Sequence, residues 1–304
     1  MLIGVDIGGT KCAVLAAEET AHGVCIRERR AFETAGKTPQ EVLAKFDESI
    51  EAYRSTYPDD EIRAVGISCG GPLDSKTGVI LSPPNLPGWD HIEITRHFTE
   101  TLGVPARLIN DANASALAEW KYGAGKGLNN VVFLTFGTGL GAGLILDGKL
   151  YSGATDTAGE VGHIRLGEYG PVGFGKSGSF EGFCSGGGIA NLGRIYAQEA
   201  FQSGKCVSYC KNAEYMPKIN AKEIAELAQG GDADAKRVFD ECGKKLGMGL
   251  SIIIDILNPD AIILGSIYLR CENLLKDAAL SVIEREALLQ PRTACKIVSA
   301  GLGE

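Results

Sequence analysis

The stretch LIGVDIGGTKCAVLA, residues 2–16, is an apolar run interrupted by one aspartate and by a Gly-Gly-Thr-Lys turn. Leu2 to Ile7 and Cys12 to Ala17 are short and β-compatible, so they predict two strands joined by a tight glycine turn. A similar arrangement returns near residues 131–146, where apolar runs flank a segment with four glycines in seven residues. This recurrence indicates two related halves.

Helices and further strands follow in alternation. Thr38-Pro39-Gln40-Glu41 is a capping box with proline at the first helical position, and the apolar spacing behind it predicts an amphipathic helix over residues 39–55. Three prolines make residues 82–89 a loop. We expect further strands at 64–68, 107–109, 131–136, 144–146 and 261–264, and helices at 112–122 and 238–257.

This alternation predicts an α/β protein with two layered domains. We expect the change of domain near residues 111–123, which gives a small first domain over residues 1–112 and a larger second one over 113–304. Residues 153–190 are rich in glycine and poor in periodicity. A long loop of this kind inside a compact domain is usually functional.

Composition excludes several classes of function. Hydrophobic residues make up 44% of the 304 residues and charged residues 22%, as in ordinary globular proteins. The net charge of −8 argues against a nucleic-acid partner. No apolar window approaches a membrane span and no basic region precedes the first apolar run, so we expect no membrane partner and a cytoplasmic location. The nine cysteines contain no C-x-x-C pair and are expected to be free thiols.

The first glycine turn has the chemistry of a phosphate site. Gly8 and Gly9 let backbone N–H groups approach phosphate oxygens, while Thr10 adds a hydroxyl and Lys11 a positive charge. Asp6, at the end of the first strand, suits the water shell of Mg²⁺, which uses few protein carboxylates. A plain hairpin turn is the alternative interpretation.

The second glycine turn, with Gly137, Thr138 and Gly139, lacks the strand-to-helix context of a dinucleotide fingerprint. We interpret it as a second phosphate-holding hairpin, with a purely structural turn as the alternative. Two such turns in different domains would clamp one nucleotide.

Carboxylates and an imidazole supply the remaining candidates. Asp111 follows a predicted strand end, where it would act as a general base toward a hydroxyl group, although Asn110-Asp111 also suits a helix N-cap. Glu160, His163 and Glu181 would bind sugar hydroxyls, or else they are scattered charges of a surface loop.

Taken in order, these segments resemble the ROK family of repressors, open reading frames and kinases. The resemblance is carried by DIGGTK (6–11), GISCGGPLD (66–74), PPNLPGW (83–89), NDANASALAEW (110–120), TFGTGLGAGLILDGKLYSGA (135–154), AGEVGHIRL (158–166), SFEGFCSGGGIA (179–190) and AIILGS (261–266). It implies the two-domain, actin-like ATPase (ribonuclease H-like) fold with an interdomain cleft. It also implies a glucokinase-like, ATP-dependent hexose kinase that forms a homodimer or homotetramer.

The resemblance further implies individual roles. Asp111 would be the catalytic base. The sugar site would comprise Gly71, Asn85, Asn110, Asp111, Glu160, His163 and Glu181. The site for ATP and Mg²⁺ would comprise Asp6, Gly8, Gly9, Thr10, Lys11, Gly137, Thr138, Gly139 and Gly265, the last of these against the adenosine.

Three departures from the family pattern qualify these roles. Gly173, Gly175 and Ser179 stand where many members carry zinc-binding cysteines, so we expect no zinc. Ser266 stands where a second glycine is usual. The chain stops where a closing helix is expected, so we expect the natural protein to extend beyond Glu304.

Other functions within the family remain open. N-acetylmannosamine, N-acetylglucosamine, fructose and allose kinases use similar groups. A sugar-binding regulatory member without catalysis is a further alternative. A repressor would need a helix-turn-helix ahead of the DIGGTK stretch, for which residues 1–5 leave no room.

Overall fold

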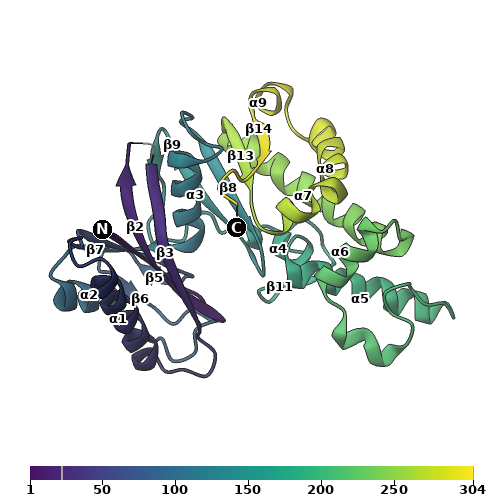
Figure 1. Cartoon of the computed structure of the whole chain (residues 1–304). Coiled ribbons are helices and arrows are strands. Elements are labelled where there is room, and N and C mark those ends of the chain that lie inside the picture. The colour runs from purple at the N-terminus through teal and green to yellow at the C-terminus, as the bar shows by residue number, and fades with distance from the viewer. Residues whose placement is uncertain (22, 304) are drawn as a thin grey trace. The chain divides into compact units, whose positions relative to one another are not determined.

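The computed structural model describes residues 1–21 and 23–303 and falls into two compact units. The first unit comprises Met1–Ala114 and Ser152–Ala158, and the second comprises Ser115–Tyr151 and Gly159–Glu304. Each unit has its own mixed sheet together with helices (Figure 1), so the predicted α/β class is confirmed.

The sheet of the first unit has the strand order β3-β2-β1-β4-β7. β1 pairs antiparallel with β2 and parallel with β4, and β4 pairs parallel with β7. The carboxyl ends of β1, β4 and β7 therefore meet at one edge of the sheet, where parallel α/β sheets bind ligands. The strands are β1 (Leu2–Ile7), β2 (Lys11–Thr20), β3 (Gly23–Glu33), β4 (Ala64–Cys69) and β7 (Ala106–Asn110).

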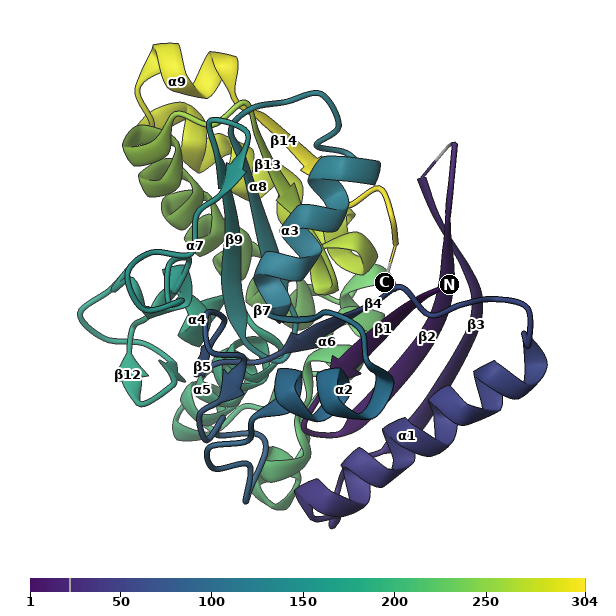
Figure 2. The same ribbon diagram turned by 90° about the vertical axis from the view of Figure 1, so that its left-hand side faces the viewer.

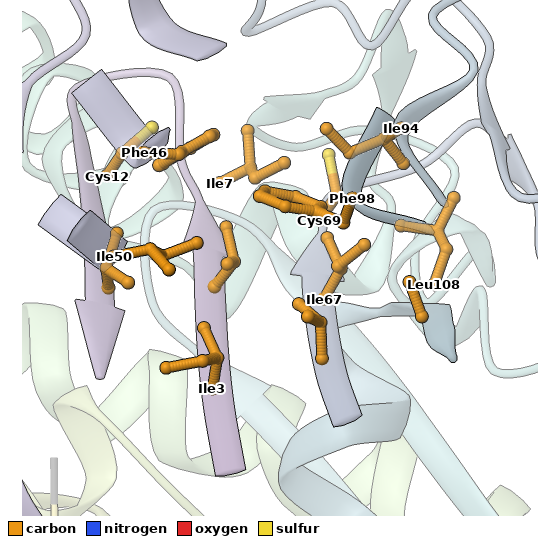
Figure 3. Packing of buried hydrophobic residues seen from close by; sticks show 14 of the residues in the cluster. Ile3, Ile7, Cys12, Phe46, Ile50, Ile67, Cys69, Ile94, Phe98 and Leu108 are labelled. Atoms are coloured by element: carbon orange, nitrogen blue, oxygen red, sulfur yellow. The ribbon is translucent and has the colours of Figure 1, made fainter. Parts of the chain in front are cut away.

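Helix α1 (Pro39–Thr56) packs against this sheet and confirms the predicted helix (Figure 2). Its capping box is present, because the Thr38 side chain accepts a hydrogen bond from the Glu41 N–H and the Glu41 carboxylate accepts one from the Thr38 N–H at 2.8 Å. Buried side chains from α1, α2 (Ile94–Leu102) and the strands form one hydrophobic core (Figure 3). This core holds the strand ends in place.

Two smaller segments complete the first unit. Strands β5 (Leu73–Asp74) and β6 (Val79–Ile80) form a short hairpin, and the segment at 82–89 contains no strand, as its prolines predict. Ser152–Ala158 returns to this unit. There the Asp156 carboxylate accepts hydrogen bonds from the Ser75 N–H at 2.8 Å and the Ser75 hydroxyl at 2.9 Å.

The sheet of the second unit has the strand order β10-β9-β8-β13-β14 and repeats the pairing directions of the first sheet. All four residues of β13 are buried, as predicted. β9 begins at Leu140, four residues before the expected strand at 144–146. The strands are β8 (Val131–Phe136), β9 (Leu140–Leu146), β10 (Lys149–Leu150), β13 (Ala261–Leu264) and β14 (Lys296–Ser299).

Helices surround this second sheet. Long helices α7 and α8 pack closely (Figure 1), since a Cβ on Gly247 of α7 would lie 2.5 Å from the Ala279 carbonyl oxygen of α8. α7 begins at Ala233, five residues before the predicted start, because Asp232 caps it by accepting the Ala235 N–H. The helices and short strands are α3 (Asp111–Tyr122), η1 (Val161–His163), β11 (Val172–Gly173), β12 (Lys176–Ser177), α4 (Phe180–Phe183), α5 (Gly186–Gln202), η2 (Ala213–Lys218), α6 (Ala221–Gln229), α7 (Ala233–Leu257), α8 (Ile267–Glu286) and α9 (Leu289–Ala294).

The cysteines are free thiols, as predicted, and most of them are buried. Cys184 is fully buried in the short turn between α4 and α5. Within residues 1–21 and 23–303, no helix is long and apolar enough to cross a membrane.

Candidate functional site

Asp6 lies at the end of β1, opposite Ser68 in the register with β4. The Ser68 hydroxyl donates a hydrogen bond to the Asp6 carboxylate. The side chain stays accessible to solvent, but surrounding protein atoms displace much of its water. This burial raises the pKa of Asp6, and the nearby negative charge of Asp111 raises it further. Two repelling carboxylates form a donor set that a cation such as Mg²⁺ would stabilise.

Asn110 and Asp111 make different hydrogen bonds at the start of α3. The Asn110 side-chain oxygen accepts hydrogen bonds from the N–H groups of Ala112 at 2.9 Å and Asn113 at 3.3 Å, so Asn110 caps the helix. Asp111 Oδ1 accepts from the Ala112 N–H at 2.8 Å. Asp111 Oδ2 lies 4.0 Å from the position that a Cβ on Gly70 would take. The capping interpretation therefore accounts for Asn110 better than for Asp111.

Two glycines directly after β4 lie next to the side chains of Asn85, Asn110 and Asp111. A Cβ on Gly70 would lie 3.7 Å from Asn85 Nδ2, and a Cβ on Gly71 would lie 3.7 Å from Asn110 Nδ2. Two amides and the Asp111 carboxylate thus surround backbone that carries no side chain. Sequence reasoning selected Gly71 and missed Gly70, although two glycines at the end of a buried strand were a visible signal.

The first glycine turn packs against the loop that carries Asn85. A Cβ on Gly9 would lie only 2.2 Å from the Asn85 carbonyl oxygen, so this position requires glycine. The Gly8 N–H donates to the Lys11 carbonyl at 3.1 Å and closes the turn. The side chains of Thr10 and Lys11 are exposed. The structure thus brings the turn, Asn85, Asn110 and both aspartates to one edge of the first sheet.

In the second unit, Glu181 binds the second glycine turn. Its Oε2 accepts a hydrogen bond from the Leu140 N–H at 3.0 Å and would lie 2.8 Å from a Cβ on Gly139. The Gly137 N–H donates to the Gly139 carbonyl at 3.0 Å, and Thr138 at the tip is exposed. Glu181 is therefore part of an ordered cluster rather than a scattered surface charge.

Ser266 shares this cluster in an unusual backbone conformation. Its φ of 54° and ψ of −115° match the first central position of a type II′ turn, and the Tyr268 N–H donates to the Gly265 carbonyl at 3.2 Å to close that turn. Ser266 Oγ would lie 3.8 Å from a Cβ on Gly137. A Cβ on Gly265 would lie 2.8 Å from the Phe133 ring, so packing demands glycine there.

The start of α5 also reaches the second turn, because the Gly186 N–H donates to the Gly137 carbonyl at 2.8 Å. Ser185 caps this helix by accepting the Gly188 N–H at 2.9 Å. Sequence reasoning did not assign these residues, although a serine followed by three glycines is a signal for a helix start with open N–H groups.

Glu160 and His163 lie at the two ends of the single turn η1 and are both exposed. The Glu160 carbonyl accepts the His163 N–H at 3.2 Å. Between them, Gly162 packs tightly, since a Cβ there would lie 2.2 Å from the Leu140 carbonyl oxygen and 3.1 Å from Glu181 Cβ. The structure therefore groups Glu160, His163, Glu181 and the second glycine turn.

The region where relatives were expected to carry zinc ligands has another role here. Ser179 Oγ accepts the Gly182 N–H at 3.1 Å and caps α4. A Cβ on Gly173 would lie 2.5 Å from the Gly182 nitrogen. Among the residues that the structure describes, no group of three or more His, Cys, Asp or Glu side chains is placed to hold a metal ion.

Comparisons with known proteins agree on one family. The family model described as ROK family matches residues 2–304. A glucokinase from Thermotoga maritima is 31% identical over 265 residues, which cover 87% of this chain and 81% of that protein. A xylose repressor from Caldicellulosiruptor bescii is 27% identical over 268 residues, which cover 87% of this chain and 65% of that protein.

The solved structures include a ROK family glucokinase from Streptomyces griseus in complex with glucose and AMPPNP. It matches with a TM-score of 0.77 at 30% identity, over 99% of this chain and 95% of that one. The two-domain, actin-like ATPase fold predicted from the sequence is therefore confirmed.

Proposed function

Because this chain belongs to the ROK family, we propose that it is an ATP-dependent hexose kinase that phosphorylates the 6-hydroxyl of glucose. One observation carries the proposal. The Asp111 carboxylate and the Asn85 amide gather over Gly70, at the same sheet edge as the first glycine turn. A base, hydrogen-bonding amides and a phosphate-type turn are the groups that phosphoryl transfer to a sugar needs.

In this proposal Asp111 accepts the proton of the attacking hydroxyl. The hydroxyl oxygen forms a bond to the γ-phosphorus as the bond to the β-phosphate oxygen breaks, and ADP leaves. Asn85, Asn110 and the open backbone at Gly71 bind the sugar. Glu160, His163 and Glu181 bind sugar hydroxyls.

The phosphates of ATP are assigned to the two glycine turns, at Gly8 to Lys11 and at Gly137 to Gly139, and the adenosine to Gly265. Asp6 would hold Mg²⁺, which neutralises charge on the phosphates. Support comes from the raised pKa of Asp6, which is caused first by burial and then by the negative charge of Asp111, because a cation between the two carboxylates would relieve their repulsion. Positioning and electrostatics supply most of the catalysis in such a transfer.

A coupled assay of ADP release tests the proposal. The protein is supplied with ATP, Mg²⁺ and one of five sugars: glucose, N-acetylmannosamine, N-acetylglucosamine, fructose or allose. We expect the highest kcat/KM with glucose. A higher value with another of these sugars would correct the substrate and keep the kinase, whereas no sugar-dependent ADP release would refute the kinase.

The repressor relative raises DNA binding as a second function to test. The net charge of −8 disfavours it, because phosphate backbones are bound by clustered basic residues. A gel-shift titration with promoter DNA across salt concentrations measures it, and we expect no salt-sensitive complex.

A further inference from the structure

The hairpin of β11 and β12 has an aromatic residue in an unfavourable backbone conformation at its tip. The register Gly173↔Lys176 leaves a two-residue loop, Phe174 and Gly175, with φ values of 43° and 74°. Two successive positive φ angles are typical of a type I′ turn, which favours Asn-Gly. A bulky residue with positive φ is an outlier, and such strain collects at functional sites.

Burial does not compensate for this strain. Phe174 is 74% exposed, and a Cβ on the adjacent Gly175 would meet no atom within 4 Å. The base of the hairpin is firmly packed instead, because Gly173 lies against α4. Backbone strain at an exposed aromatic side chain on a fixed base leads to the hypothesis of a binding role.

The neighbour of Phe174 is His163. Their ring centroids lie 6.5 Å apart and their planes meet at 75°, so the two rings do not cover each other's faces. Polar bonds tie the hairpin to the segment that carries His163. Lys176 Nζ donates to the His163 carbonyl at 2.6 Å, and Arg165 Nη1 donates to the Ser177 carbonyl at 2.7 Å. Phe174 and His163 are therefore held as one structural element.

We propose that Phe174 determines sugar specificity by packing its ring against the C–H face of a pyranose whose hydroxyls His163 binds. This inference rests on the proposed function, which assigns His163 to the sugar. A hexose with equatorial hydroxyls presents a continuous apolar face, and an aromatic ring is a rigid surface for it. A pyranose has two faces: an axial hydroxyl at C2 or C4, as in mannose or galactose, interrupts one face, and an axial hydroxyl at C3, as in allose, interrupts the other. Phe174 would therefore favour glucose over the epimers whose axial hydroxyl points toward its ring.

Phe174→Asn separates binding from folding, because asparagine suits the type I′ turn. We expect the Tm of F174N to rise by about 2–4 °C. We expect its KM for glucose to increase about fivefold, the scale of one aromatic contact, while KM for ATP and kcat at saturating glucose stay unchanged. The preference for glucose should shrink by a similar factor against either mannose or allose, whichever carries its axial hydroxyl on the face that Phe174 contacts, and should stay unchanged against the other.

Two controls accompany this variant. Phe174→Tyr retains the ring and should keep KM within twofold of the wild-type value. Val172→Thr changes another exposed apolar residue of the same hairpin, 52% exposed, and should alter neither KM.

An F174N enzyme with wild-type KM for glucose and unchanged selectivity would overturn the inference and leave the kinase intact. If the wild type releases no ADP with any sugar, the proposed function fails instead. Calorimetric titration with glucose then decides: weaker binding by F174N than by the wild type supports the inference, and equal binding or none refutes it.

Discussion

The first sheet, β3-β2-β1-β4-β7, and the second sheet, β10-β9-β8-β13-β14, share strand order and pairing directions but differ at matching positions. The penultimate residue of β1 is Asp6, whereas that of β8 is Thr135. The residue after β7 is Asp111, whereas the residue after β14 is Ala300. The scaffold is repeated, but only the first sheet carries carboxylates at these two strand ends.

The two glycine turns also differ, in how tightly their central residues are packed. The first turn is packed, with Gly9 against the backbone of Asn85, whereas the residue in the matching place of the second turn is the exposed Thr138. Glycine in the first turn is needed for folding. In the second turn, a Cβ on Gly137 would lie no closer than 3.8 Å to its nearest neighbour, the Ser266 hydroxyl, so packing does not require glycine at that position. The two halves of the repeated scaffold thus differ in the charges at their strand ends and in how tightly their glycine turns are packed.

The largest expected effect is on catalysis and tests the carboxylates at the strand ends of the first sheet. Asp111→Asn should lower kcat by at least about a hundredfold, because an amide cannot accept the hydroxyl proton. Glucose binding, measured by calorimetry, should remain within a few fold of wild type. The exposed Asp59 serves as a matched control, since Asp59→Asn should leave kcat unchanged. Near-normal turnover by D111N would remove the base assignment.

A pair of alanine variants tests the difference between the turns. Gly9→Ala forces a Cβ to within 2.2 Å of a backbone oxygen and should lower the free energy of unfolding by about 1–3 kcal/mol. Gly137→Ala places its Cβ no closer than 3.8 Å to any atom and should preserve the Tm. Its KM for ATP should nevertheless rise about tenfold, through a lost phosphate contact.

Thermal unfolding and the KM for ATP are measured for both variants. Equal losses of stability in G9A and G137A would contradict the predicted difference in packing between the two turns. An unchanged KM for ATP in G137A would remove the second turn from the proposed nucleotide site.

A smaller effect is expected at Ser266, the strained residue beside the second turn. Ser266→Gly should stabilise the protein by about 1 kcal/mol, because glycine adopts the type II′ conformation without strain. The KM for ATP should fall, since a side chain next to Gly137 is removed. Ser266→Ala retains the Cβ and is the control, with no gain in Tm expected. If S266A gained as much stability as S266G, the gain would come from loss of the hydroxyl and not from relief of backbone strain.

The smallest effect concerns pH. The folded protein raises the pKa of Asp6 above its ordinary value of 3.8, through burial and the charge of Asp111. The folded state therefore holds this proton longer than the unfolded state, so stability falls as pH rises above 3.8 through the folded pKa. Asp6→Asn should raise the Tm slightly at pH 7, and the difference should shrink toward pH 4.

Differential scanning fluorimetry at pH 4 to 8 measures this difference. Because Asp111 contributes to the shift, D111N should show part of the same gain. A D6N variant that is less stable than wild type at pH 7 would contradict the assigned repulsion.

Local signals were sufficient for much of the fold. The capping box at Thr38 predicted the start of α1, and the apolar run at 261–264 predicted a buried strand. Edge strand β3 was missed because its charged, mostly exposed residues form no apolar alternation. Strand β14 was missed because its two apolar residues, Ile297 and Val298, lie between Lys296 and Ser299 and give no periodic signal. Pairing with β13 makes the segment a strand.

Some residues of the candidate site could likewise be found from local sequence signals, and others could not. Chain order identified Asp6, Asp111 and both glycine turns, because strand ends and turns are local features of a sequence. The hydrogen bonds of Glu119 could not be predicted from the sequence. Its buried carboxylate accepts N–H groups from Ala124 at 2.8 Å, Gly301 at 3.0 Å and Leu302 at 2.9 Å, and so joins α3 to a segment 182 residues away.

The sequence by itself determined most of the central strands, both glycine turns and the identity of the reactive groups, because these depend on neighbours within a few residues. Tertiary structure alone decided that Asn85 lies over Gly70, that Glu181 binds the second turn and that Phe174 stands beside His163. Such contacts join residues that lie up to 41 positions apart in the chain. They arise only when strands pair and the core closes, which no local pattern specifies.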